Sequence, residues 1–337
     1  MAIVPPDPGL CREWLAPFQV DARLTLSVHR HGGGDPAYRV DAAGAIWRTS
    51  LTPEGPGTLR IVSRSRPPAG VLEQPGVLEQ PGVLEQQGTL ITGQAWGPGA
   101  GWLLRTLPAQ LGAHDDPSGF RAAHAVVGEL VLRHPGLRIG RTGRVFEALV
   151  PAVLEQKVVG HEARRAWRFL LRTFGEPAPG PAPAGMRVFP PPRVWARIPS
   201  WQWHRAGVEG VRARTIMNAA AVAARLEQVL DSDPDPDPGS GEADRLLRSL
   251  PGIGIWTSAE IRQRAAGDPD AVSVGDYHLA KAVGWTLTGQ ITDDAGMLEL
   301  LAPYAGHRYR VTRLIELGGR LPPRRGPRMS IRDYRAF

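Results

Sequence analysis

A Gly- and Pro-rich turn and a single aspartate that follows it are the residues of this chain best placed to do chemistry. The turn, Leu250–Thr257, reads LPGIGIWT and lies between two segments of helical periodicity, 242–250 and 256–266. Its two glycines permit a left-handed backbone and the close approach of another backbone. Amides at the start of the second helix then face outward, where they can hold a phosphate oxygen. The aspartate, Asp276, places one carboxylate at the start of another helical segment.

Each segment also has a purely structural interpretation. A turn such as Leu250–Thr257, taken alone, is often only a helix C-cap. A Gly-Asp pair before a helix, here Gly275-Asp276, is usually only an N-cap. Together, in this order and at this spacing, the two are more specific. The combination resembles the helix-hairpin-helix, Gly/Pro-rich loop and aspartate signature of DNA glycosylases.

Several further segments resemble the AlkA-type 3-methyladenine DNA glycosylases. The stretch 133–139, RHPGLRI, resembles the family's RPGLRLPG, and 146–156, which begins FE and ends VLEQ, resembles FE…ILGQ. Asp276-Tyr277 matches the catalytic DDY, and Pro303-Tyr304 resembles the late PWRSY element. The resemblance covers residues 99–318 well and residues 14–98 loosely.

The expected fold is α+β, an N-terminal antiparallel β-rich domain followed by an all-α helix-hairpin-helix glycosylase domain. We expect the first domain at 1–98, the glycosylase domain at 99–318 and a basic tail at 319–337. Alternating or β-rich patterns predict strands at 23–29, 45–51, 58–62 and 88–96. A six-residue repeat, GVLEQP, occurs three times at 70–87, with the third copy ending in Gln87, and is interpreted as an expanded loop between strands. Helical periodicity predicts helices at 101–111, 118–134, 145–156, 162–174, 201–205, 210–230 and 306–317.

The charge distribution bears on nucleic-acid binding, and the cysteine content excludes several kinds of metal and disulfide site. The net charge of +7 is uneven: residues 1–98 sum to −1 and residues 99–337 to +8, so the positive field belongs to the part with the hairpin. Only two of the 40 basic residues are lysines, a bias typical of GC-rich coding, so the high pI alone is weak evidence for nucleic acid. The single cysteine, Cys11, excludes a disulfide framework, a Cys-based zinc site and a four-Cys iron–sulfur cluster.

No apolar run reaches membrane-spanning length, and the N-terminus lacks the basic-then-apolar layout of a signal peptide. We therefore expect a soluble cytoplasmic protein, associated with the nucleoid if the resemblance holds.

The resemblance implies the roles of three residues at the reaction centre. Asp276 would be the catalytic carboxylate, which stabilises an oxocarbenium-like sugar and orients or deprotonates the attacking water. Trp256 stands where related bifunctional enzymes have a Schiff-base lysine, so a monofunctional enzyme is implied. Trp256 and Tyr277 would form the base pocket, where a cationic alkylated base gains roughly 0.5–2 kcal/mol from cation–π attraction. Arg313 replaces the family's second pocket aromatic.

The resemblance also implies how DNA is held. The expected contacts from the hairpin are Leu250, Gly252, Ile253, Gly254 and Thr257, with a monovalent cation possible at Gly252 and Gly254. Arg262 and Arg264 would extend the phosphate contact. Gln156 and Lys157 belong to the loop that probes the duplex. Because the family has an apolar residue after this glutamine, Lys157 could instead contact a phosphate or the unpaired base.

We therefore expect a DNA-3-methyladenine glycosylase II-like hydrolase that acts in base excision repair. It would cleave the N-glycosidic bond of damaged bases, alkylated purines above all, in double-stranded DNA. We expect a monomer with no cofactor, no metal and no membrane partner. The first alternative is a catalytically degenerate protein that only binds damaged DNA. The second is a regulator that uses the β domain as a sensor, although residues 1–98 offer no pocket motif.

Overall fold

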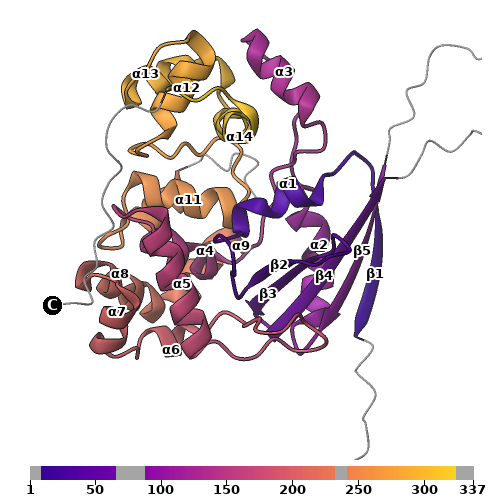
Figure 1. Ribbon diagram of the computed structural model, residues 1–337, viewed down its shortest axis with the longest axis vertical. Coiled ribbons are helices and arrows are strands. Elements are labelled where there is room, and N and C mark those ends of the chain that lie inside the picture. The colour runs from indigo at the N-terminus through magenta and orange to yellow at the C-terminus, as the bar shows by residue number, and fades with distance from the viewer. Residues whose placement is uncertain (1–8, 66–87, 232–240, 324–337) are drawn as a thin grey trace, which may run out of the picture.

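A five-stranded antiparallel sheet stands beside a larger body of helices (Figure 1). The computed structural model describes residues 9–65, 88–231 and 241–323. The GVLEQP repeat at 70–87 and most of the basic tail therefore lie outside the described residues. The architecture confirms the predicted α+β fold with an N-terminal β-rich part.

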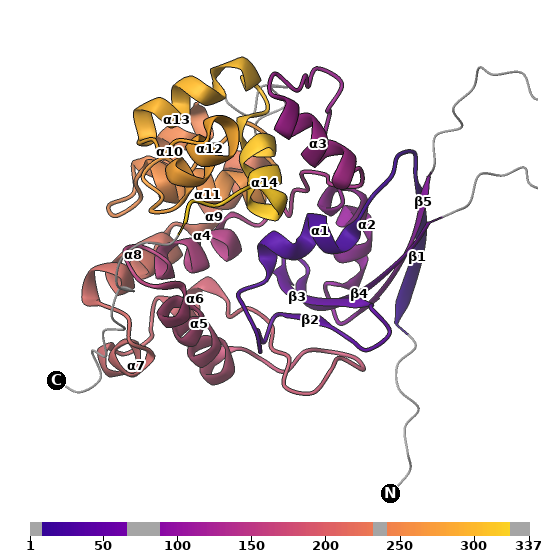
Figure 2. The same ribbon diagram turned by 45° about the horizontal axis from the view of Figure 1, so that its top comes forward.

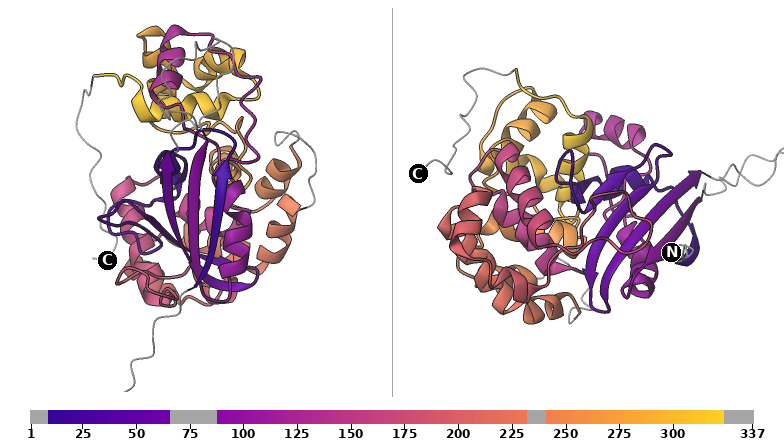
Figure 3. Two further views of the ribbon diagram at one scale, coloured as in Figure 1. Left: turned by 90° about the vertical axis from the view of Figure 1, so that its right-hand side faces the viewer. Right: turned by 60° about the horizontal axis from the view of Figure 1, so that its bottom comes forward.

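The strands lie in the order β1-β5-β4-β3-β2. They are β1 (Leu10–Ala16), β2 (Tyr38–Val40), β3 (Ile46–Thr52), β4 (Gly55–Ser65) and β5 (Thr89–Trp96). Side chains of β5 alternate, so that Ile91 and Ala95 are buried against helix α2 (Ala100–Gln110) on one face of the sheet (Figure 3). On the other side, Trp47 and Trp96 stack at 5.6 Å and pack against Met186. Both faces of the sheet are thereby covered.

The strand prediction for residues 23–29 is wrong. This segment forms helix α1 (Ala22–Leu26) and the short helix η1 (Ser27–His29). The Asp21 side chain caps α1 by accepting the Leu24 amide at 2.9 Å. The predicted strands at 45–51, 58–62 and 88–96 lie in β3, β4 and β5, whereas β1 and β2 were not predicted.

Apart from α1 and α2, which pack in the core of the sheet, the helices of the described residues form two apolar clusters (Figure 2). One joins α4 (Val145–Leu154), α5 (Gly160–Phe174), α6 (Pro192–Trp195), α7 (Ser200–Ala206), α8 (Gly210–Ala221), α9 (Ala223–Asp231), α10 (Glu242–Arg248) and α11 (Ile255–Ala265). The other joins α3 (Ala125–Arg133), α12 (Leu279–Thr288), α13 (Asp294–Leu301), η2 (Ala302–Tyr304) and α14 (Arg308–Gly318). No helix in the described part of the chain is both long and apolar enough to cross a membrane.

Two predicted helices differ in extent. Only the second half of 118–134 is helical, as α3. The segment 210–230 is divided into α8 and α9, because the Val222 amide turns back to the Ala219 carbonyl at 3.2 Å and ends α8. Helix α2 packs in the core of the sheet rather than with the helices that follow it. The boundary at residue 98 remains a prediction.

Polar contacts fasten the sheet to the helical body. Asp35, fully buried after the loop 32–34, accepts the Trp167 indole N–H of α5 at 2.8 Å. Its carboxylate also accepts the backbone amides of His31 at 2.7 Å and Ala37 at 2.9 Å. A buried carboxylate is stable only when donors replace its hydration, and here three donors do so.

Replacing Asp35 with alanine should lower the free energy of unfolding by about 3 kcal/mol or more, because three buried donors lose their acceptor at once. Asp35→Asn keeps one acceptor oxygen and should cost less. Asp41→Ala is a matched control, since Asp41 also accepts a tryptophan indole, from Trp47, at a partly exposed site. Urea denaturation measures all three. Equal effects of Asp35→Ala and Asp41→Ala would contradict the role given to burial.

Candidate nucleic-acid interface and active site

The hairpin between α10 and α11 needs a glycine at position 252 for two independent reasons. Its φ of 91° lies in the left-handed region. A Cβ there would also stand 2.1 Å from the Thr215 hydroxyl of α8. Gly254, by contrast, is extended with φ −97°, and the space where its Cβ would point is open. Both glycines are exposed, but only Gly254 could carry a side chain without a clash or a strained backbone.

Side chains beneath the turn hold it in place. Ile253 and Thr257 are buried, and Leu250 packs on the core that α4 and α8 share. The Gln156 amide donates to the Gly252 carbonyl and to the Thr257 hydroxyl, both at 2.9 Å. Gln156 thus braces the hairpin. Because the side chains of Ile253 and Thr257 are buried, these residues can contact a ligand only with their backbone atoms.

The Asp276 carboxylate is fixed through both of its oxygens. Oδ1 accepts the amides of His278 at 2.8 Å and Leu279 at 2.9 Å, at the start of α12. Oδ2 accepts the Trp256 indole N–H of α11 at 3.3 Å. The backbone before it turns through Gly275 at φ 90°, which favours glycine. The two residues predicted to share the reaction centre, Asp276 and Trp256, are therefore in direct contact.

Tyr277 has a different environment from Trp256. Its side chain is 72% exposed, and its ring lies edge-on to His278 at 4.8 Å. The Lys281 ammonium sits 4.4 Å from the ring centroid. The assignment of Tyr277 to a base pocket remains a prediction.

A row of polar residues, Glu260 and Arg264, follows Trp256 along α11, an arrangement that the sequence interpretation missed. This row is called the polar seam. Glu260, one helical turn on, accepts the Ser273 hydroxyl and the Arg264 guanidinium, the latter at 2.7 Å. Arg264, a further turn on, donates to the Val28 carbonyl of η1 at 3.1 Å. The spacing of four residues along α11 was the available signal.

Residues of η1 and α14 lie next to this polar seam. Arg313 donates to the Ser27 hydroxyl at 2.6 Å and to Glu316 at 2.9 Å. Burial, followed by the neighbouring guanidinium of Arg48, lowers the pKa of His29 well below its usual value. The position implied for a pocket aromatic thus holds an arginine whose charge Glu316 balances.

The two arginines expected to extend the phosphate contact are engaged inside the protein. Arg262 pairs with Asp268 at 2.5 Å and lies 3.8 Å from Asp244. Arg264 pairs with Glu260 in the seam described above. Neither side chain is presented to a phosphate at the turn, because a buried carboxylate is the closer and better-desolvated partner.

Three segments meet on the face that carries the hairpin. The Arg212 guanidinium of α8 donates to the Leu154 carbonyl at the end of α4 at 2.8 Å, and the Thr215 hydroxyl donates to the Pro251 carbonyl at 3.4 Å. These bonds place the first turn of α8 beside both the hairpin and the loop of Lys157. Val211, in that turn, is 61% exposed. Sequence analysis did not identify this third segment.

Lys157 stands out in the probing loop. It is exposed, and it is the one non-glycine residue with a left-handed backbone, φ 53°, in the part of the chain that the structure describes. Such backbone strain persists where the surrounding structure enforces it and is concentrated at functional sites. The loop thus presents a cation on the same side as the hairpin.

Comparison with known proteins shows similarity to a DNA repair protein in sequence. The chain is 36% identical over 158 residues to a Mycobacterium tuberculosis protein described as a probable bifunctional transcriptional activator/DNA repair enzyme AlkA. The match covers 47% of this chain and 30% of that relative, so the chain spans less than a third of the relative's length. No family model matches the chain.

Solved structures share the fold over most of the chain. A 3-methyladenine DNA glycosylase from Archaeoglobus fulgidus matches with a TM-score of 0.66 at 16% identity, covering 90% of this chain and 97% of that one. An 8-oxoguanine glycosylase/lyase from Clostridium acetobutylicum matches with a TM-score of 0.60 at 10% identity, covering 91% and 96%. The chain therefore shares its fold with these DNA glycosylases and is similar in sequence to the AlkA relative over 158 residues.

Proposed function

We propose that the protein is a monofunctional DNA glycosylase that hydrolyses the N-glycosidic bond of damaged bases, alkylated purines above all, in double-stranded DNA. The observation that carries the proposal is the Asp276 carboxylate, held between the α12 amides and the Trp256 indole beside the hairpin. The proposal includes a monomer that works in the cytoplasm on nucleoid DNA without a cofactor.

Binding would begin at the hairpin. Its exposed amides around Gly254 hold phosphate oxygens and position the duplex without selecting a sequence. The exposed face formed by Lys157, Val211 and the hairpin would support the distorted duplex while the target nucleotide leaves the stack. The monovalent cation suggested at Gly252 and Gly254 remains a prediction.

At the reaction centre, the bond between the base nitrogen and C1′ breaks, and its electron pair leaves with the base. A cationic alkylated purine departs as a neutral molecule, which makes it a good leaving group. The sugar becomes cationic, and the Asp276 charge stabilises it. Water adds to C1′, and its proton passes to the carboxylate, so that the product is an abasic strand.

A catalytically degenerate protein that only binds damaged DNA is the alternative. The arrangement of Asp276 favours the enzyme, because its carboxylate is ionisable, partly exposed and oriented by three donors. An incision assay on alkylated duplexes, with the abasic product cleaved by alkali, decides between the two proposals.

Asp276→Asn should slow base release by about 10² to 10³ or more, because the charge that stabilises the sugar cation is lost. The amide oxygen still caps α12, so folding and DNA affinity should change little. Single-turnover excision and a binding titration measure the two effects. Asp293→Asn is the matched control, since Asp293 caps α13 through the Gly296 amide. Normal excision by Asp276→Asn would remove Asp276 from the mechanism.

The two hairpin glycines should respond differently to alanine. Gly254→Ala places a methyl group in open space, so the fold should survive while affinity for all duplexes falls by a similar factor. Gly252→Ala meets Thr215 and a left-handed φ, so it should destabilise the protein itself. Thermal unfolding and DNA titration separate the two effects, with Gly128→Ala on α3 as control. Wild-type affinity of Gly254→Ala would contradict the phosphate contact.

Borohydride should trap no covalent complex with DNA. Trp256 has no amine and cannot form a Schiff base. The Lys281 ammonium is engaged by the Tyr277 ring, 4.4 Å from its centroid. A bifunctional glycosylase serves as positive control for trapping. A trapped species that disappears in Lys281→Ala would instead assign a lyase activity to that lysine.

A further inference from the structure

Helix α5 carries a row of arginines on its outer side. Arg164, Arg168 and Arg172 recur every four residues, so they lie on one face of the helix. The opposite face buries Trp167, together with apolar residues of the core around α4. At 1.5 Å rise per residue, neighbouring arginines of this row are about 6 Å apart along the helix. Arg164, Arg168 and Arg172 together form the α5 arginine stripe.

The stripe lies against the glycine loop 32–34 of the N-terminal part. Arg168 donates to the Gly33 carbonyl at 3.2 Å, and Arg172 donates to the Gly34 carbonyl at 3.4 Å. A Cβ built on Gly32 would stand 2.6 Å from the Arg164 side chain. Each guanidinium has five N–H donors, so these contacts orient the groups while leaving donors for another acceptor.

The stripe differs from several other arginines of α11 and α14 in the partners that it contacts. Arg262, Arg264 and Arg308 each pair with a carboxylate. Arg168 and Arg172 instead donate to backbone carbonyls of the loop 32–34, and Arg164 lies near the Glu155 carboxylate, which pairs with His31. The nearby Asp35 carboxylate is fully buried and is occupied by its three internal donors. Arg164 and Arg172 are exposed and Arg168 is half-buried, so much of the positive charge of the stripe is accessible to solvent.

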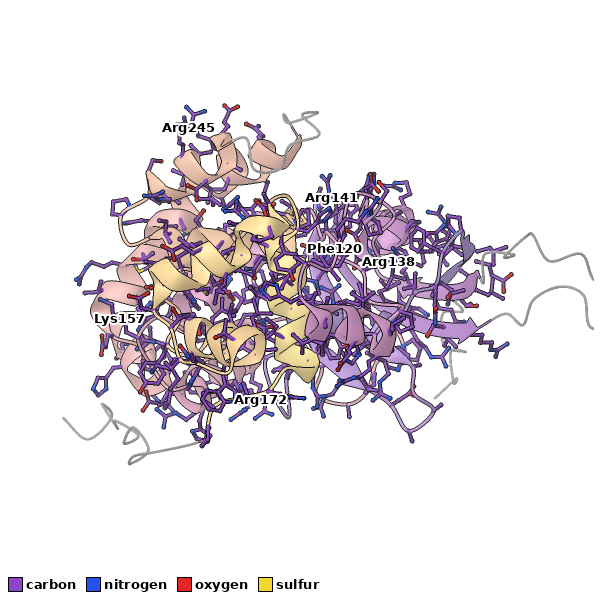
Figure 4. The ribbon with its side chains drawn as sticks, turned by 90° about the horizontal axis from the view of Figure 1, so that it is seen from above. Phe120, Arg138, Arg141, Lys157, Arg172 and Arg245 are labelled. Carbon is purple, nitrogen blue, oxygen red and sulfur yellow. The ribbon has the colours of Figure 1, made fainter. Side chains whose placement is uncertain are left out.

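The stripe also begins close to the proposed DNA-binding face. Helix α5 starts at Gly160, directly after the loop of Lys157, and Arg164 lies in its second turn. Figure 4 shows Lys157 toward the left of the molecule and Arg172, the last arginine of the row, below it. Regularly spaced guanidinium groups fit a ligand with regularly spaced anions, as a nucleic-acid backbone has.

We propose that the α5 arginine stripe is a second phosphate-binding surface, which holds the backbone of duplex DNA on one side of the lesion. The inference rests on the proposed function, because it assumes that the Lys157 loop and the hairpin bind DNA. The stripe adds affinity without base specificity, since phosphate contacts carry no sequence information. It also gives the protein a footprint that extends to one side of the damaged base.

The test is the salt dependence of binding to a lesion-bearing duplex and to the same duplex without the lesion. Removing three phosphate contacts in R164Q/R168Q/R172Q should flatten the slope of log K against log salt concentration by about 2 to 3 for both duplexes. Affinity at low salt should fall at least tenfold. Duplexes shortened on one side of the lesion should abolish this difference between wild type and variant, and shortening on the other side should not.

Two further variants keep the result interpretable. R164K/R168K/R172K retains the charges and should keep most of the slope. R12Q/R60Q/R64Q removes the same charge from β1 and β4, where Arg12 and Arg60 also bond uncharged partners, and should leave the slope unchanged. Unfolding curves check that all variants fold.

A slope of R164Q/R168Q/R172Q equal to that of R12Q/R60Q/R64Q would overturn the inference, as would equal losses in the lysine and glutamine variants. In either case, lesion excision by the wild type would leave the proposed function standing. Absence of both DNA binding and excision in the wild type would overturn the inference and the proposed function together.

Discussion

The two oxygens of Asp276 are bound by donors from different elements, the amides of α12 and the indole of α11. A carboxylate on a flexible side chain would otherwise rotate and sample many orientations. Here its direction is set only when α11 and α12 keep their relative positions, and the two helices belong to different apolar clusters. The packing between these clusters therefore determines whether the charge points toward a substrate.

The position of α11 depends in turn on contacts at its start. Gln156 donates a hydrogen bond to the Gly252 carbonyl of the hairpin, and the Thr215 hydroxyl of α8 donates to the Pro251 carbonyl. Arg212 connects α8 to the end of α4, immediately before the probing loop. Hydrogen bonds of 2.8 to 3.4 Å connect these segments directly to one another. A single rigid platform thus holds the surfaces that would grip the backbone and the residue that would act on the sugar.

The parts of this arrangement that could be predicted are those encoded in a few consecutive residues. The conformation of the glycines in Leu250–Thr257 and of the aspartate before α12 depends on neighbouring residues in the sequence, so both were identified from sequence. The contact between Trp256 and Asp276 was not specified, because it depends on how two helices pack. The strand predicted at 23–29 failed because Asp21 caps a helix there, which buries Ala22, Thr25 and Leu26 at helical spacing instead of every second residue. Arg262 and Arg264 look available in sequence, since their carboxylate partners are recognisable only once α11 is folded.

The left-handed backbone of Lys157 has a consequence for how the sequence at this position can vary. A residue with a Cβ costs about 1–2 kcal/mol in that conformation, and glycine would avoid the cost. Selection for stability alone would therefore favour glycine, with asparagine or aspartate as the next most tolerant residues. A lysine here indicates that its long cationic side chain contributes something that outweighs the loss. Among homologues, we expect a cationic residue at this position in proteins whose loop has the same function, and glycine in proteins that share only the fold.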